Sequence, residues 1–486
     1  MEKILNEKNK KYAENCFQKS IEIGLDFKLN NEVKKEKMDL WEFSKLSQTG
    51  ITVDKILNDF NVNIKPFCTN FSNVNFMGFP DAGNSIAGIS AAILSDFMQQ
   101  NLINSSFCAP VATFMEIDVI NWLRDVIGYK VNYNIKTVND IGGLITYGGT
   151  GSNSIAMLLA RENHKKNTMK NGVVSPEDFK VIIPKGIGHY SIRSSLMWIG
   201  CGDNVIEVET DNYKYNLDSL KKALEDNKGK VMCVVSYVGD SRTMTIENLN
   251  EVYNIVKGFD KNIWLHADAC HGFSLAFSKK LKSKIFGIEK FDSISTDPHK
   301  VLMIPYCISA LLLKNPQQIK TIFSSSDLIM QEELALGQIT PFIGSKSWVS
   351  LKLWMTLRNF GIKGIGDIIE RRCEMAQYLK REIMNRKDFI LLNDVDINSV
   401  VFMYVGNYKT DDINFLNDLN KEIYNYLLDE GKYYLHKFSI LDNKGVIKKN
   451  ELLIPLRYMS GNDNIRKKDV VDMLNHIVAV AKKIKR

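Results

Sequence analysis

The feature that most constrains the fold is an alternation of short apolar runs with helical stretches across residues 142–315. Segments such as NLDSLKKALEDNKG and TIENLNEVYNIVKGF have the spacing of amphipathic helices, and the runs between such segments have the length and composition of buried strands. These runs are GGLITYG, KVIIPKG, NVIEVET, KVMCVVSYVGD, NIWLHADA, FDSISTDP and CISALLLKN. The alternation predicts an α/β fold with a largely parallel sheet that is covered by helices on both faces.

Helical segments flank this alternating region. Residues 85–125 have helical periodicity, and Pro110 can open a helix that Gly128 ends. After residue 350 a long helix is expected over SWVSLKLWMTLRNF, followed by a mixed segment. The last helix has apolar residues at helical spacing, which predicts one buried stripe made of Val470, Met473, Leu474, Ile477, Val478, Ala481 and Ile484.

Composition excludes several classes of protein. With 45% apolar residues the chain is not disordered, and its net charge of +7 is spread along its length. A nucleic-acid partner is not expected, because it would require a concentrated basic stripe. The N-terminal MEKILNEKNKKYAENC is too charged for a signal peptide, and no apolar run is long enough to span a bilayer. We therefore expect a cytoplasmic protein with no membrane partner. The eight cysteines form no CxxC pair, so we expect them to be reduced thiols.

Polar residues directly after the apolar runs are the candidate site residues, because ligands of open α/β sheets bind beyond the carboxyl ends of the strands. The first such place is the turn 148–151, which contains Gly149 and Thr150. A helix is expected to begin just after it, near Ser152 or Asn153. Glycine lets the backbone approach an anion, and free amides at a helix N-terminus attract one. The turn therefore suits a phosphate, although it is also consistent with an ordinary strand-to-helix connection.

The run NIWLHADA ends with a carboxylate. His266 and Asp268 point to the same face of a strand and His271 follows, which raises the possibility of a metal site. No His, Asp or Glu cluster elsewhere supplies obvious further ligands, so no metal is expected. Asp268 can instead hold a protonated ring nitrogen, as the pyridinium partner does in pyridoxal phosphate enzymes. The simpler alternative is a salt-bridged or capping aspartate.

Two further polar residues follow strand-like runs. Lys300 comes after Asp297, Pro298 and His299, where a buried ammonium would have a depressed pKa and act as an amine nucleophile. The commoner case at such a position is a solvated lysine. His189 follows KVIIP in GIGHYSI, where an imidazole can stack on a cofactor ring or can simply be packed.

Taken in this order, these motifs resemble the group II pyridoxal-phosphate-dependent amino acid decarboxylases, which include aromatic amino acid, glutamate, histidine and 2,4-diaminobutyrate decarboxylases. The resemblance extends from about Phe76 to the C-terminus, and HADA with DSISTDPHK is its most specific part. The other matching segments are FMGFP, APVATFMEIDVINWL, TYGGTGSN, HYSI, SLKLWMTLRNFGIKG and PLRYMSGNDN. The resemblance implies pyridoxal 5'-phosphate (PLP) as cofactor and decarboxylation of an L-amino acid to the corresponding amine.

The resemblance also implies roles for individual residues. Lys300 corresponds to the lysine that binds the cofactor covalently, and Asp268 to the carboxylate that keeps the pyridine nitrogen protonated. His189 corresponds to the histidine that stacks on the ring. The residues that correspond to positions near the phosphate or the ring substituents are Gly149, Thr150, Ser241, Asp297 and His299.

The family fold is that of the aminotransferases (fold type I), and its active sites lie at the interface of a homodimer. By this resemblance residues 1–110 form a helical dimerisation segment. Residues 111–360 form the PLP-binding large domain around a mainly parallel seven-stranded sheet, and residues 361–486 form a small α+β domain.

The substrate pocket is expected at GFPDAG, which matches the segment that lines the side-chain pocket of the aromatic decarboxylases. This match nominates Phe79, Pro80 and Asp81, while Asn104 falls where those enzymes place an aromatic residue from the neighbouring subunit. An acid and an amide predict an aromatic or polar substrate with a distal amine, hydroxyl or ring NH. Alternatively, Asp81 only caps the following helix.

One departure from the family bears on the product. In the aromatic decarboxylases a mobile loop carries a tyrosine that protonates the substrate carbon after CO₂ leaves, and the corresponding residues 323–346 contain no tyrosine. Another group such as His189 would then deliver the proton, or oxygen would divert part of the substrate to an aldehyde. The alternatives are therefore an aldehyde synthase or a carbon–carbon lyase of the same family, or a PLP-binding homologue without catalysis.

Overall fold

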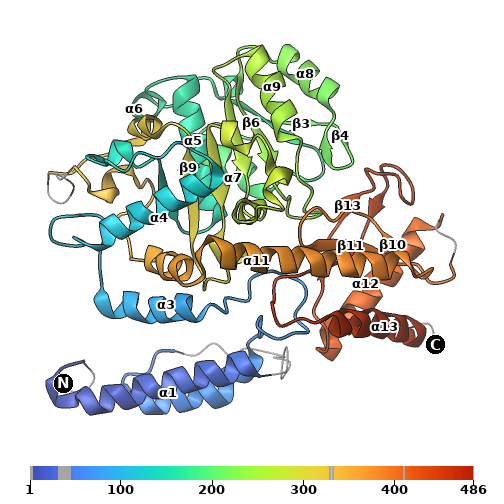
Figure 1. Ribbon diagram of the computed structural model, residues 1–486, viewed down its shortest axis with the longest axis horizontal. Coiled ribbons are helices and arrows are strands. Elements are labelled where there is room, and N and C mark those ends of the chain that lie inside the picture. The colour runs from blue at the N-terminus through green and yellow to red at the C-terminus, as the bar shows by residue number, and fades with distance from the viewer. Residues whose placement is uncertain (1–3, 31–44, 328–329, 331–332, 409–410, 485–486) are drawn as a thin grey trace.

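The protein consists of a large sheet flanked by helices, a smaller sheet with its own helices, and a pair of N-terminal helices that lies below helix α3 in Figure 1. The structure is a computed structural model. It describes residues 4–30, 45–327, 330, 333–408 and 411–484.

Seven strands form the large sheet in the order β1-β9-β8-β7-β6-β2-β3. They are β1 (Gly143–Thr146), β2 (Lys180–Pro184), β3 (Val205–Val208), β6 (Val231–Tyr237), β7 (Trp264–Asp268), β8 (Ser293–Thr296) and β9 (Ser309–Leu313). Strands β3, β2, β6, β7 and β8 are parallel, and β9 runs antiparallel to both β8 and β1. Each predicted apolar run supplies one strand, so the mainly parallel sheet is confirmed.

Helices flank this sheet (Figure 1). They are α4 (Ala112–Ile127), α5 (Gly149–His164), α6 (Thr168–Asn171), α7 (Tyr190–Trp198), α8 (Leu217–Asp226), α9 (Leu249–Phe259) and α10 (Pro298–Val301); a small hairpin joins β4 (Thr210–Asp211) to β5 (Lys214–Tyr215). The start of α5 predicted near Ser152 or Asn153 is wrong, because the helix begins at Gly149. Gly148 has a φ of 92°, which only glycine adopts readily, and its carbonyl already accepts the N–H of Gly151.

The small sheet is antiparallel and has the order β10-β11-β15-β12. Its strands are β10 (Phe389–Leu391), β11 (Ser399–Tyr404), β12 (His436–Lys437) and β15 (Leu456–Met459), and β13 (Ile440–Leu441) pairs separately with β14 (Leu452–Leu453). Helices α12 (Ile413–Glu430) and α13 (Lys467–Ile484) accompany them. In α13 the predicted stripe is buried except for Val478 and Ile484, which are partly buried.

Helix α11 (Ser350–Met384) connects the two sheets. It packs against α4 and α3 (Ile86–Met98) at one end and against the small sheet at the other. Its helical geometry is interrupted at Gly361, where φ is 62° and ψ is 177°. The interruption lies at the position where the large and small domains were expected to meet.

The N-terminal helices α1 (Lys10–Leu29) and α2 (Val53–Asp59) bury little of their surface. Cys16 is the only buried residue of α1, whereas several large apolar side chains of that helix are exposed: Tyr12, Phe17, Ile21, Leu25 and Leu29. Within the residues that the structure describes, every helix is too short or too polar to cross a membrane. All eight cysteines are free thiols.

Candidate active site

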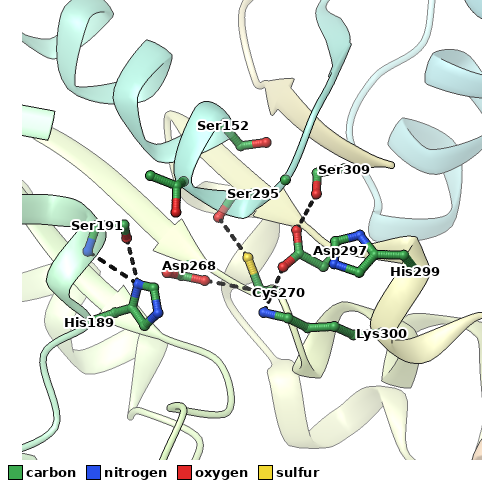
Figure 2. A network of polar contacts seen from close by, with 12 residues as sticks. Ser152, His189, Ser191, Asp268, Cys270, Ser295, Asp297, His299, Lys300 and Ser309 are labelled. Carbon is green, nitrogen blue, oxygen red and sulfur yellow. Dashed lines mark hydrogen bonds and ion pairs between the residues drawn. The ribbon is translucent and has the colours of Figure 1, made fainter. Parts of the chain in front are cut away.

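One cavity of ≈ 180 Å³ opens at the carboxyl ends of strands β2, β6, β7 and β8. Figure 2 shows His189, Asp268 and Lys300 directed toward a common space there. The lining includes every residue that the sequence placed near the cofactor: Gly149, Thr150, His189, Ser241, Asp268, Asp297, His299 and Lys300. It also includes residues that sequence reasoning missed or did not connect to the cofactor: Asn153, Tyr190, Tyr237, Gly239, Cys270 and His271.

Asp268 is the last residue of β7 and lies buried at the bottom of this cavity. Its carboxylate accepts hydrogen bonds from the Asn153 side-chain amide at 2.9 Å and from the Cys270 N–H at 3.2 Å. Burial alone would raise the pKa of Asp268, but the neighbouring His189 imidazole and these hydrogen bonds outweigh burial and hold the pKa below its usual value. The carboxylate is therefore ionised and suited to a cationic N–H partner.

A chain of hydrogen bonds behind Asp268 fixes its position. The Asn153 Oδ1 bonds to His266 Nε2 at 3.0 Å, and His266 Nδ1 bonds to the Ser293 hydroxyl at 2.8 Å. The Trp264 indole N–H also donates to that hydroxyl, at 2.7 Å. Both ring nitrogens of His266 are thus used, and the described residues contain no group of three or more His, Cys, Asp or Glu suited to a metal. In the sequence, Asn153 could have been singled out because it lies in the first turns of the helix that follows the glycines of residues 148–151.

Lys300 lies in the short helix α10, directly after β8. Its amine forms an ion pair with Asp297 at 2.7 Å, and the Ser309 hydroxyl donates to the same carboxylate. The expectation of a depressed pKa for Lys300 is wrong. Burial does lower it, but the adjacent Asp297 carboxylate outweighs burial and raises the pKa above its usual value. The lysine is therefore protonated in this arrangement and must lose a proton before its amine can react with a carbonyl.

The N-terminus of α5 faces the same cavity. Within the described part of the chain, the N–H groups of Gly149 and Thr150 have no backbone acceptor, which leaves them free for an anion. A Cβ on Gly149 would lie 2.7 Å from the Cys270 sulfur and 2.8 Å from the Asp297 carboxylate, so no larger residue fits. Asp297 therefore stands close to this end of the cavity, where the ammonium of Lys300 balances its charge.

His189 caps helix α7 beside the cavity. The Ser191 N–H donates to its Nδ1, so the proton of the neutral ring lies on Nε2, and the Tyr237 hydroxyl accepts the His189 N–H at 2.8 Å. Burial lowers the pKa of His189 although Asp268 opposes the shift, so the neutral ring is favoured. His299 is held through Nδ1, which donates to the Ile308 carbonyl at 2.6 Å.

Four further residues each have a buried polar atom with no hydrogen-bond partner among the described residues. These atoms are Asp81 Oδ1, Arg457 Nε, His271 Nδ1 and His436 Nδ1, and we call these four residues the outer side of the site. Arg457 donates through its other nitrogens to the carbonyls of Ser241 and Gly78. The motif PLRYMSGNDN contained this arginine, but its role was not deduced from the sequence.

The residues proposed for the substrate lie outside the ≈ 180 Å³ cavity. Phe79 lies between Arg457 and His436, with ring distances of 5.7 and 4.8 Å. Asn104 is buried, and its Oδ1 accepts N–H groups of its own loop. Asp81 does not cap α3, because Ser85 does so through its hydroxyl. The roles of Phe79, Asp81 and Asn104 stay predictions.

Part of the expected mobile loop, residues 323–346, is anchored in the core. Leu336–Ile339 is a buried helical turn. Lys346 forms an ion pair with Glu116 at 2.6 Å, and both side chains are only 1% exposed. The segment is therefore not one loose loop up to Lys346. Residues 328–329 and 331–332 of this segment lie outside the described residues.

The features of this cavity together fit PLP. A lysine amine suits its aldehyde, an ionised buried carboxylate suits its protonated ring nitrogen, and the open amides of α5 suit its phosphate. The imidazole of His189 and the side chain of Cys270 both line the cavity, where each would be available to contact the cofactor ring.

Comparisons with known proteins agree with this fit. The family model of the pyridoxal-dependent decarboxylase conserved domain matches residues 37–405. The aromatic-L-amino-acid decarboxylase of Bacillus atrophaeus is 24% identical over 90% of this chain and 88% of its own length. The phenylacetaldehyde synthase of Petunia hybrida is 22% identical over 79% of this chain and 78% of its own length.

Solved structures with a similar fold include decarboxylases as well. The crystal structure of Oryza sativa TDC with PLP and tryptamine superposes with a TM-score of 0.87 over 99% of this chain and all of that one, at 17% identity. Because the family model covers well over half of the chain, the protein belongs to the pyridoxal-dependent decarboxylases and is an enzyme that uses PLP.

Proposed function

We propose that this enzyme removes the α-carboxylate of an L-amino acid as CO₂ and releases the corresponding amine. The observation that carries the proposal is the convergence of Lys300, Asp268 and His189 on one cavity, opposite the open N-terminus of α5. When bound, PLP draws electrons away from the substrate α-carbon, so that the bond to the carboxylate can break.

The chain's own residues hold and protonate the reacting groups. Lys300 supplies the primary amine that anchors the cofactor, and Asp268 holds a proton on the pyridine nitrogen. His189 contacts the ring and presents its Nε2 proton to the reacting side. Gly149 and Thr150 bind the phosphate through their N–H groups, and the positive end of the α5 dipole strengthens this binding.

Arg457 is suited to orient the substrate by its carboxylate. Its guanidinium is buried, its Nε has no partner among the described residues, and its hydrogen bonds go to neutral carbonyls. The charges of Asp240 and Asp81 act on it, but neither forms an ion pair with it among the described residues. Burial lowers its pKa to about 10, so it stays charged at neutral pH. A buried cation without a carboxylate partner is costly, and a substrate carboxylate would compensate it.

The active form is proposed to be a cytoplasmic homodimer with the three units predicted from the sequence. Tyr190 lines the cavity yet is 65% exposed, so one chain leaves the site open to solvent. Other exposed apolar side chains lie on α1, on α3, on the loop after α3 and on the loop before α11, among them Phe17, Ile86, Phe107 and Phe342. A second copy would cover these side chains and close the site.

A second candidate activity is oxygen-dependent conversion of the amino acid to an aldehyde. It is favoured by the lack of any tyrosine among residues 323–346, because such a tyrosine would donate the proton that completes the amine. In that reaction one O₂ is reduced to H₂O₂ and one water is consumed for each amino acid that is converted to aldehyde, CO₂ and ammonia.

The test is to incubate PLP-loaded enzyme with a panel of aromatic, acidic, basic and neutral polar L-amino acids, and to measure CO₂ and amine. Equal amounts of CO₂ and amine from at least one of them, lost in Lys300→Ala, are expected. Borohydride reduction followed by peptide mapping reports separately whether the cofactor is attached at Lys300. Attachment without CO₂ release from any amino acid would overturn the proposal and favour a non-catalytic homologue.

A further inference from the structure

A second and larger cavity, of ≈ 530 Å³, lies beside the site. We call it the outer cavity, and its lining includes Asp81, Tyr306, Ile89, Ile93 and Ile304. Asp81 and Tyr306 do not line the first cavity, but both lie next to residues that do. The Tyr306 ring is 5.0 Å from that of His299, and Asp81 interacts electrostatically with Lys300 and His299. These two residues therefore stand between the reacting amine and the outer cavity.

The Asp81 carboxylate has an unpaired oxygen. Its buried Oδ1 has no hydrogen-bond partner among the described residues, and the Tyr306 hydroxyl lies close enough to act on the carboxylate as a hydrogen-bond donor. Burial raises the pKa of Asp81, and the hydrogen bond and the charges of Lys300 and His299 oppose that shift. Since Ser85 caps α3, Asp81 has no local structural task that would explain an acid here.

The cations near Asp81 have other partners. Lys300 is paired with Asp297 in this structure. Arg457 is assigned to the substrate carboxylate by the same proposal. The Lys28 amine donates to three uncharged oxygens, those of Ser72, Ala82 and Asn84, at 3.0, 3.1 and 3.2 Å. Asp81 thus has no close ion pair among the described residues, although the charges of Lys300, His299 and Arg457 act on it.

We propose that Asp81 determines the substrate specificity of this enzyme, and that the preferred substrate is an L-amino acid whose aliphatic side chain ends in a primary ammonium group. That this amino acid is a substrate, and not only a ligand, rests on the decarboxylation proposed above. An ammonium can donate to the open Oδ1 in a charge-assisted hydrogen bond, while its methylene groups contact the isoleucines of the outer cavity. An acidic side chain would be repelled, and a neutral one would leave the carboxylate unpaired.

The test uses PLP-loaded enzyme and three amines of equal length, putrescine, 4-amino-1-butanol and pentylamine, whose binding is measured by calorimetry. All three offer the same amine to the cofactor and differ only at the far end. We expect putrescine to bind at least about tenfold more tightly than the other two, the effect of one charge-assisted hydrogen bond. Asp81→Asn should bring the three affinities to within about twofold.

Asp96→Asn is the matched control, because Asp96 also lines the outer cavity but is exposed on α3. This variant should keep the preference for putrescine. Asp81→Ser removes the same charge through a smaller side chain and replaces Asp81→Asn if that variant does not fold. Equal wild-type affinities for putrescine and 4-amino-1-butanol, or a preference that survives both Asp81 variants, would overturn the assignment.

Kinetics separate this inference from the proposed reaction. CO₂ release from L-lysine or L-ornithine should exceed release from L-norleucine, and Asp81→Asn should remove that difference. If putrescine is preferred through Asp81 but no amino acid releases CO₂, the binding assignment holds and decarboxylation fails. If CO₂ comes only from aromatic or acidic amino acids and putrescine is not preferred, decarboxylation holds and the role of Asp81 is wrong.

Discussion

The inner and outer sides of the active site differ in how completely their polar groups are paired. On the inner side, an unbroken chain of hydrogen bonds joins Asp268, Asn153, His266, Ser293 and Trp264. On the outer side, unpaired polar atoms belong to Asp81, Arg457, His271 and His436. Buried polar groups are nearly always paired in folded proteins. One chain therefore builds the half that receives the cofactor, whereas the outer half needs partners from a ligand or a second subunit.

The strongest way to break the inner side is Lys300→Ala, because no other group there offers a primary amine. The variant loses the ion pair with Asp297, but Asp297 keeps its hydrogen bond from the Ser309 hydroxyl, so we expect the variant to fold. Turnover should fall by at least about four powers of ten, or about 5.5 kcal/mol. Steady-state CO₂ release is the measurement, and Lys279→Ala, an exposed lysine nearby in the sequence, is the control. Multiple turnovers at the wild-type rate would refute the assignment.

Asp268→Asn tests whether the inner side works through charge or only through shape. The amide has nearly the same size as the carboxylate but cannot stabilise a proton on the cofactor ring. We expect the rate to fall by about three powers of ten, roughly 4 kcal/mol, with a much smaller change in PLP affinity. Rate and affinity are measured separately by CO₂ release and by PLP titration.

The control for this variant is Asp218→Asn, whose side chain is 91% exposed on α8. It should leave both quantities unchanged. A loss below tenfold for Asp268→Asn would mean that another group holds the ring proton.

The inner side was also the half that the sequence predicted well. Buried parallel strands are continuous apolar runs, so all seven strands were found, and functional residues of such sheets follow the strand ends. Lys300, Asp268 and His189 could therefore be nominated from their places in the sequence. Asn153 was missed because its partner Asp268 is 115 residues away, and only the folded chain brings the two side chains together.

Other errors have similarly physical causes. The pKa of Lys300 was judged from burial alone, whereas the turn of α10 places Asp297 against the amine. The outer side was harder, because its residues come from segments as distant as Asp81, His271 and Arg457, which no local pattern connects. The hydrogen-bond partners of its unpaired atoms would also come from a ligand or a second subunit, which the sequence of one chain does not describe.

Acid should weaken the inner side through His266. Burial lowers the pKa of this histidine to about 4, against about 6.5 in an unfolded chain. Between these values the unfolded state binds a proton that the folded state does not, so the free energy of unfolding falls as the pH falls. The loss across this window is about 3 kcal/mol for His266 alone. Urea unfolding of wild type and His266→Asn from pH 7 to 4.5 is the measurement, and identical pH slopes would contradict the prediction.

His189 lies where the two sides meet, because its Nδ1 is fixed by Ser191 while its Nε2 proton remains for the reacting groups. If this proton completes the amine, His189→Gln should lower amine formation by about a hundredfold, roughly 2.7 kcal/mol, while CO₂ release continues. Amine, ammonia, aldehyde and peroxide are assayed with and without oxygen, and His476→Gln on α13 is the control.

Equal losses of CO₂ and amine would limit His189 to ring contact. Predominant aldehyde from the wild type, with equal ammonia and peroxide, would instead show that the outer side admits oxygen before any proton is delivered.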